Sequence, residues 1–174
     1  MVDRAPGPTL SINRRAVLIA LVAGAATAPG ITVWAQARSD LRRFLIDLPG
    51  WTASPPSTFN SVAEMLIQRE YTRDDTTLLA TLEIGLLGPP TAFGALTTHA
   101  PDQVPQKDTI AGFAVERVHV ESEDSGAIVV VLVDSEKRPA VFLLEYDGLS
   151  AETAMDTARE FDWPAMQQAV SSPR

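Results

Sequence analysis

The amino-acid sequence predicts an α+β fold: an antiparallel β-sheet of about five strands with helices packed on one face, behind an N-terminal signal segment. Apolar and polar residues alternate over residues 64–71 and 77–86, which is the period of half-buried strands. Residues 127–133 are apolar at every position, which is typical of a central strand covered on both faces. The expected order is helix, hairpin, short helix, three further strands and helix, and this order indicates an antiparallel sheet rather than alternating β-α units.

The chain begins with a targeting segment. Arg14 and Arg15 form a positive region ahead of residues 16–37, which contain no charged residue. The apolar run that opens this stretch is too short for a membrane span, and Pro29 interrupts any helix through it. Small residues end the stretch in the pattern that signal peptidase requires, so we expect cleavage after Ala37.

The sequence is thereby divided into a signal peptide, residues 1–37, and one mature α+β domain, residues 38–174. The full chain of 174 residues, 45% of them hydrophobic and 21% charged, has an ordinary globular composition that favours a single domain. We expect a periplasmic or secreted protein. The alternative is a retained inner-membrane anchor with the domain facing the periplasm, because residues 16–37 would just cross a hydrocarbon core of roughly 30 Å if helical throughout.

The paired arginines also resemble a twin-arginine export signal, whose pattern is Ser/Thr-Arg-Arg-x-Phe-Leu-Lys. Arg14, Arg15 and Leu18 match this pattern. The positions that depart from it are Asn13, Val17 and Ile19. The resemblance implies export of the folded domain, and the general secretory route is an equal alternative.

Composition excludes several classes of function. The chain has no cysteine, and therefore no disulfide and no thiolate metal site. Cleavage after Ala37 removes three arginines and one aspartate from 14 basic and 22 acidic residues, which leaves 11 basic and 21 acidic residues and a net charge of −10. A surface of this sign repels phosphate backbones and anionic headgroups. We expect no nucleic-acid partner, and membrane contact only through the N-terminal segment.

Periodicity predicts the elements of the mature domain in order. Leu41, Phe44, Leu45 and Leu48 have helical spacing, and Pro49 ends that helix. The remaining elements are a loop at 54–57, a hairpin of strands 64–71 and 77–86 with one wet side, a short helix at 91–98, a loop at 100–108, and strands at 127–133 and 139–146. Two helices close the chain, one capped by Ser150 and one starting at Pro164.

The alternation slips within residues 110–120, which we interpret as a strand pair or as one long strand. Phe113 and Val115 share one parity, whereas Val118 and Val120 share the other. A β-bulge near residues 116–117 would bring the two pairs onto the same face.

The step Leu48-Pro49-Gly50-Trp51 and the order of elements over residues 40–170 resemble exported bacterial domains of unknown function and, more loosely, the PsbP-like fold. That resemblance implies an accessory or ligand-binding protein rather than an enzyme.

Candidate catalytic residues are few. His99 and His119 are the only histidines, and no spacing of ligands predicts a metal or a cofactor. The alternation places His119 on the surface or rim of its strand. His99 is a candidate general base with Asp102 as its orienting partner, although no serine motif accompanies it. Carboxylate pairs are a second candidate, and the acidic cluster at residues 121–124 is interpreted as a solvated turn.

Trp51 and Trp163 lie beside proline-containing loops, where a large aromatic residue lines either the core or a pocket. Together with His99, they are the candidate binding residues. The sequence favours an exported, non-catalytic accessory protein that binds a protein partner or a small apolar ligand. The alternatives are a small periplasmic hydrolase that uses His99 or a carboxylate pair, and an anchored subunit of a membrane complex.

Overall fold

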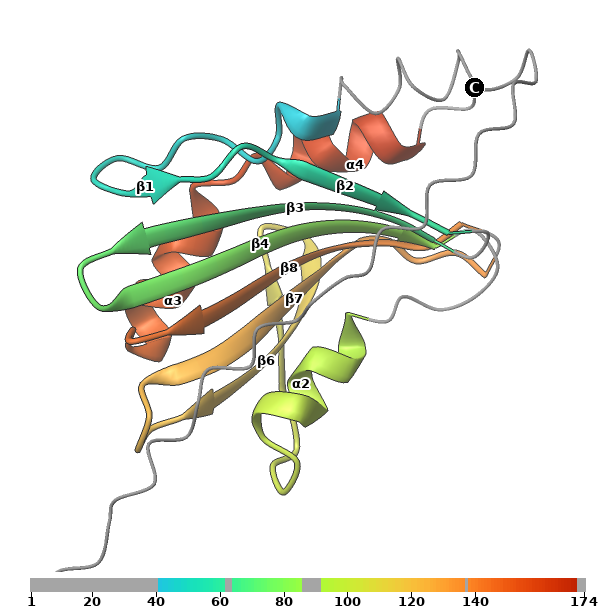
Figure 1. The fold of residues 1–174 in the computed structure, drawn as a ribbon. Coiled ribbons are helices and arrows are strands. Elements are labelled where there is room, and N and C mark those ends of the chain that lie inside the picture. Colours follow the sequence, from blue (N-terminus) through green and yellow to red (C-terminus); the bar gives the residue numbers. More distant parts are fainter. Residues whose placement is uncertain (1–40, 62–63, 86–91, 137, 172–174) are drawn as a thin grey trace, which may run out of the picture.

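A computed structural model describes residues 41–61, 64–85, 92–136 and 138–171 (Figure 1). These residues form one eight-stranded sheet in which every pairing is antiparallel, and this confirms the α+β class with an antiparallel sheet. The sheet order is β1-β3-β4-β8-β7-β6-β5, with β2 also paired to β3. The strands are β1 Thr52–Ala53, β2 Ser57–Asn60, β3 Glu64–Arg73, β4 Thr76–Gly85, β5 Gln106–Ile110, β6 Phe113–Val120, β7 Ser125–Val133 and β8 Ala140–Asp147.

The prediction of about five strands was too low, because three short strands at the sheet edges lack a clear pattern. β5 lies largely inside the predicted loop at 100–108, and it pairs with β6 through a two-residue turn. Ala111 and Gly112 of that turn both have positive φ angles, 51° and 85°, as a tight hairpin of this type requires. β1 and β2 flank the proline-containing loop, where period 2 is too brief to detect.

Helices cover both faces of the sheet, so the prediction of helices on one face was wrong. α3 (Ala151–Arg159) and α4 (Trp163–Ser171) pack on one face, and α2 (Phe93–His99) packs on the other (Figure 1). Two separate clusters of buried residues correspond to these faces. The apolar run of β7 is explained by this arrangement, because a strand between two layers of helix must be apolar in both parities.

The change of parity within β6 also results from having a core on each face of the sheet. The bulge predicted near residues 116–117 is not present. The pairing of β6 with β7 is continuous from Val115 to Val120. Phe113 and Val115 belong to the core under α3 and α4, whereas Val118 and Val120 pack with the core under α2. The two parities therefore point to two different cores.

The predicted hairpin is confirmed by β3 and β4, which pair over their full lengths. The face of this hairpin that was expected to contact solvent is only partly exposed, however. Thr81 and Glu83 of β4 are buried, and Glu83 Oε2 accepts a hydrogen bond of 2.8 Å from the backbone N–H of Ala92, next to the start of α2. Glu83 is thus buried where the chain enters α2, a contact that the sequence pattern did not reveal.

At the N-terminal side of the domain, the predicted inward residues are correct, but the helix ends earlier than expected. Leu41, Phe44, Leu45 and Leu48 are all buried. Among the described residues, helical structure covers 41–42 only, and the backbone N–H of Phe44 then donates to the carbonyl of Leu41, three residues earlier. The chain reaches β1 through a turn in which Gly50 has a φ of 78°.

The two C-terminal helices agree with the prediction. The Ser150 hydroxyl accepts a hydrogen bond from the backbone N–H of Thr153 and caps α3. Ala154, Met155 and Ala158 form the buried stripe of α3. α4 begins at Trp163, one residue before the predicted start.

The predicted signal residues Arg14, Arg15 and Ala37 lie outside the described residues. Within the part of the chain that the structure describes, no helix has both the length and the apolar character needed to cross a membrane.

Candidate functional site

A groove with a volume of about 750 Å³ lies at one end of the sheet. The end of β7, the start of β6, the start of β8, Phe93 of α2 and Gln167 of α4 meet there. We call this hollow the sheet-end groove. Its lining residues are Phe93, Gly112, Phe113, Ala114, Glu116, Val131, Leu132, Val133, Asp134, Ser135, Glu136, Pro139, Val141 and Gln167.

Most of the groove lining is apolar. Phe93, Val131 and Val133 are each partly exposed there, so their side chains are available to a bound molecule. The register between β7 and β8 is irregular between Val131 and Val133. Such an irregularity bends a strand and ends its regular pairing, which is a common feature beside binding sites.

Trp163 packs against one lining residue of the groove, Phe113. The Trp163 ring meets Phe113, a lining residue, edge-to-face at a centroid separation of 5.9 Å. Trp163 itself is only 3% exposed and belongs to the core, and its indole Nε1 is buried without a hydrogen-bond partner among the described residues. The structure thus places Trp163 behind the groove wall rather than in it.

Trp51 lies elsewhere, just before β1, at the opposite edge of the sheet from β5. Its ring is half-buried and is covered by the Arg73 guanidinium, 4.3 Å from the ring centroid. Trp51 and Trp163 therefore do not form one site. Trp51 packs against the main core and anchors the segment that leads into β1.

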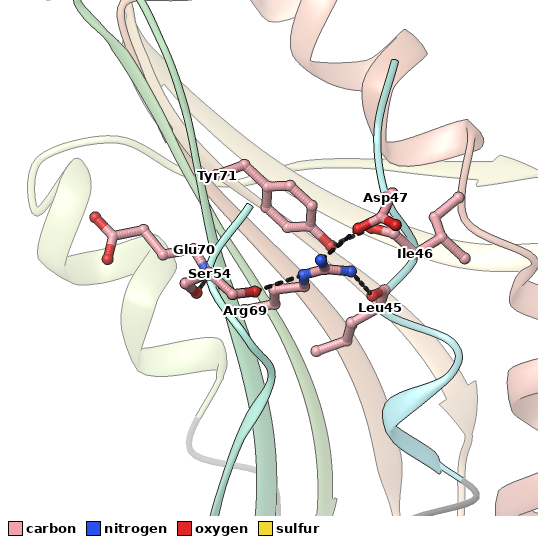
Figure 2. Close-up of polar contacts among 7 residues, drawn as sticks. All are labelled: Leu45, Ile46, Asp47, Ser54, Arg69, Glu70 and Tyr71. Carbon is pink, nitrogen blue, oxygen red and sulfur yellow. Dashed lines mark hydrogen bonds and ion pairs between the residues drawn. The ribbon is translucent and has the colours of Figure 1, made fainter. Parts of the chain in front are cut away.

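Arg69 of β3 holds that same segment onto the sheet, as Figure 2 shows. Its Nε donates to the Ser54 carbonyl at 2.8 Å, its Nη1 donates to the Leu45 carbonyl at 2.6 Å, and its Nη2 pairs with Asp47. The Tyr71 hydroxyl beside it donates to the Ile46 carbonyl at 2.8 Å. All these partners are backbone groups or an exposed carboxylate, so the arrangement is a structural clamp.

The sequence contained a signal for Arg69 that the periodicity argument did not use. Arg69 has the same parity in β3 as Met65, Ile67 and Tyr71, which all point into the core. A basic side chain on the core-facing side of a strand needs hydrogen-bond acceptors near it, because burying an unpaired charge is costly. Here the acceptors are the carbonyls of the segment that crosses the sheet.

His99, the proposed general base, ends α2 and lies against β8. Its Nε2 is 3.2 Å from Oε1 of Glu145, which takes the place expected for Asp102. Among the described residues, no Ser, Thr or Tyr hydroxyl lies within hydrogen-bonding reach of His99. The contact ties the end of α2 to the sheet, and its geometry does not favour the hydrolase hypothesis.

His119 lies at a second, smaller hollow of about 280 Å³. Its ring stacks on Tyr146 with a centroid separation of 5.9 Å, and its Nδ1 is 3.1 Å from the Tyr146 hydroxyl. Burial raises the pKa of Tyr146 to about 12, although the nearby Arg117 acts in the opposite direction. A phenol with this pKa stays protonated at neutral pH and serves here as a hydrogen-bonding residue.

In the described part of the chain, no group of three or more acidic, histidine or cysteine residues is arranged to hold a metal ion. Comparison with protein-family models, with curated proteins and with solved structures finds no match. The fold and the groove together define an α+β protein with a single antiparallel sheet and a hollow at one sheet end. The PsbP-like resemblance stays an expectation.

Sequence reasoning did not find the sheet-end groove. Its walls come from residues between 93 and 167, which are contributed by strands and helices far apart in the chain. Local periodicity reports only which side chains avoid water, and it does not report which elements leave a gap between them.

Proposed function

We propose that this is an exported, non-catalytic binding protein that holds a small apolar ligand in the sheet-end groove. The observation that carries the proposal is the groove itself: its volume of about 750 Å³ falls within the range of small-molecule sites. Its mostly apolar lining, with a few polar groups at the edge, is the usual chemistry of such sites. The export part of the proposal rests on the leader pattern around Arg14, Arg15 and Ala37.

Binding is tested with the neutral fluorescent probe N-phenyl-1-naphthylamine, titrated into the purified protein. Ala114 is an exposed groove residue on β6, so Ala114→Trp fills the groove without disturbing the core. Thr77→Trp is the matched control, because Thr77 is exposed on β4 at the opposite end of the sheet. We expect saturable binding that Ala114→Trp weakens by about tenfold, equivalent to 1.4 kcal/mol. Equal affinities for the two variants, or no saturable binding, contradict the proposal.

Export is tested by N-terminal sequencing of the protein recovered from the periplasmic fraction of a bacterial host. Cleavage after Ala37 predicts Arg38 as the first residue. The intact chain recovered with the membrane instead supports the anchored alternative, and the intact chain free in the cytoplasm overturns export altogether.

A further inference from the structure

Among the described residues, the charged side chains that line the sheet-end groove are all acidic. Glu116 comes from β6, and Asp134 and Glu136 follow the end of β7. No lysine, arginine or histidine is among the lining residues that the structure describes. An apolar hollow surrounded by carboxylates attracts a cationic ligand and repels an anionic one.

The basic residues that the structure describes near the groove do not cancel this charge; Lys137, which follows Glu136 in the sequence, lies outside the described residues. Lys107 pairs with Glu116 at 2.8 Å, but its own side chain is 71% exposed whereas that of Glu116 is 22% exposed. An exposed ammonium of this kind is an easily displaced partner. Asp134 and Glu136 form no ion pair among the described residues, and Arg138 follows them without lining the groove.

We propose that the ligand of the groove is an amphipathic cation: a small molecule with an apolar body and an ammonium or guanidinium group. This inference rests on the proposed function and names the class of ligand. The apolar body lies against Phe93, Val131 and Val133, and the cationic group lies among the carboxylates of Glu116, Asp134 and Glu136. Attraction at Glu116, whose side chain is 22% exposed, is stronger than in bulk water, because the groove walls replace part of the surrounding solvent; Asp134 and Glu136 are exposed and attract the cation at the rim.

The whole domain supports the same selectivity. The predicted mature chain has 21 acidic and 11 basic residues, and a net negative field of this size attracts cations and repels anions over a range of about 8 Å at physiological salt. Fatty acids and anionic phospholipids have the wrong charge for such a groove. An apolar amine has the right one.

The test compares three ligands that share one apolar body: dodecylammonium, dodecanol and dodecanoate, each kept below its aggregation threshold. Each ligand competes with N-phenyl-1-naphthylamine for the purified protein. We expect dodecylammonium to bind about tenfold more tightly than dodecanoate, with dodecanol between them. The double variant Asp134→Asn/Glu136→Gln should reduce this preference to about threefold or less.

The matched control is Glu152→Gln/Glu160→Gln, which removes two exposed acidic charges at α3, away from the groove. It should retain the preference for the cation. Lys107→Gln, which frees the Glu116 carboxylate, should strengthen dodecylammonium binding by about twofold to threefold.

The outcomes separate the two proposals. Three ligands that bind with equal affinity leave the groove function standing and overturn the cation preference. A preference that falls equally in the groove variant and in its control shows only a general charge effect, which also overturns it. If none of the three ligands displaces the bound probe, the cation preference is overturned. If the probe itself does not bind, the proposed function fails, and the inference fails with it.

Discussion

Tyr146 of β8 lies directly across Gly126 of β7, its partner in the strand register. A Cβ atom at Gly126 would lie 2.5 Å from the Tyr146 hydroxyl and 2.3 Å from the carbonyl of Val118 on the other neighbouring strand. The Tyr146 hydroxyl uses this space to donate to the Val118 carbonyl at 3.4 Å and to meet His119. The ring thus covers the glycine and connects three strands.

We therefore predict that Gly126→Ala destabilises the protein by about 3 kcal/mol, because the added methyl group displaces either the Tyr146 ring or the Val118 backbone. Urea unfolding followed by tryptophan fluorescence measures the change. Gly94→Ala in α2 is the control: nothing lies within 4 Å of the position of its Cβ, and alanine is the better helix former by about 1 kcal/mol. A similar loss for both variants would contradict the close contact.

Arg69→Met should cost about 2 kcal/mol of folding free energy, because it leaves the part-buried carbonyls of Leu45 and Ser54 without their donor. The comparison variant is Asp47→Asn. The Asp47 side chain is 87% exposed against 13% for that of Arg69, so its loss should cost less than about 1 kcal/mol. Denaturant unfolding of both variants decides the matter, and equal costs would show that the ion pair, not the carbonyl contacts, holds the segment.

The two tyrosines of the chain, Tyr71 and Tyr146, should lose their phenolic protons at a higher pH than free tyrosine does. Burial raises the pKa of each from its ordinary value of 10 to about 12, against the opposing effect of Arg69 at Tyr71 and of Arg117 at Tyr146. The unfolded chain loses these protons first as the pH rises. Stability is therefore unaffected by these groups below about pH 10 and falls between about pH 10 and 12.

Phenolate absorbance against pH measures this titration directly. We expect little phenolate in the folded protein at pH 10, where free tyrosine is half ionised, and a steep rise when alkaline unfolding occurs. Tyr146→Phe should halve the amplitude and reduce the loss of stability between pH 10 and 12. Ionisation with an ordinary midpoint in the folded protein would mean that the phenols are in contact with water.

Trp163→Ala should cost about 3 to 5 kcal/mol, because it removes a fully buried indole that packs against Phe113. Trp51→Ala should cost less than half as much, since that ring is half-buried and its Arg73 contact is worth about 0.5 to 1 kcal/mol. Thermal or urea unfolding of the two variants provides the comparison. The opposite order would place Trp51, not Trp163, at the centre of the core.

Several features of this fold could be predicted from local pattern. The hairpin of β3 and β4, the strands β7 and β8 and the cap at Ser150 were all identified from period, turn residues and capping chemistry. The inward positions around Leu45 were also correct, even though the helix there ends earlier than expected. Each of these depends on neighbours only a few residues apart, and such information is written in the sequence itself.

The surroundings of the candidate site residues could not be predicted from the sequence. Trp51 and Trp163 were proposed together, yet the structure places one at a sheet edge and the other in the core behind a groove wall. His99 was proposed with Asp102, and its partner is Glu145 on a strand 46 residues away. A side chain's partner depends on which strands lie side by side, and no local spacing determines that.

Local pattern is enough to identify the side chains that avoid water and the points where the chain turns, because both depend on short-range periodicity and backbone stereochemistry. The elements that cover the apolar surface are known only from the folded chain: α2 on one face, α3 and α4 on the other, and a groove at the sheet end. Burial of an apolar face is not directional, so its strength depends on the area buried and not on the identity of the covering element.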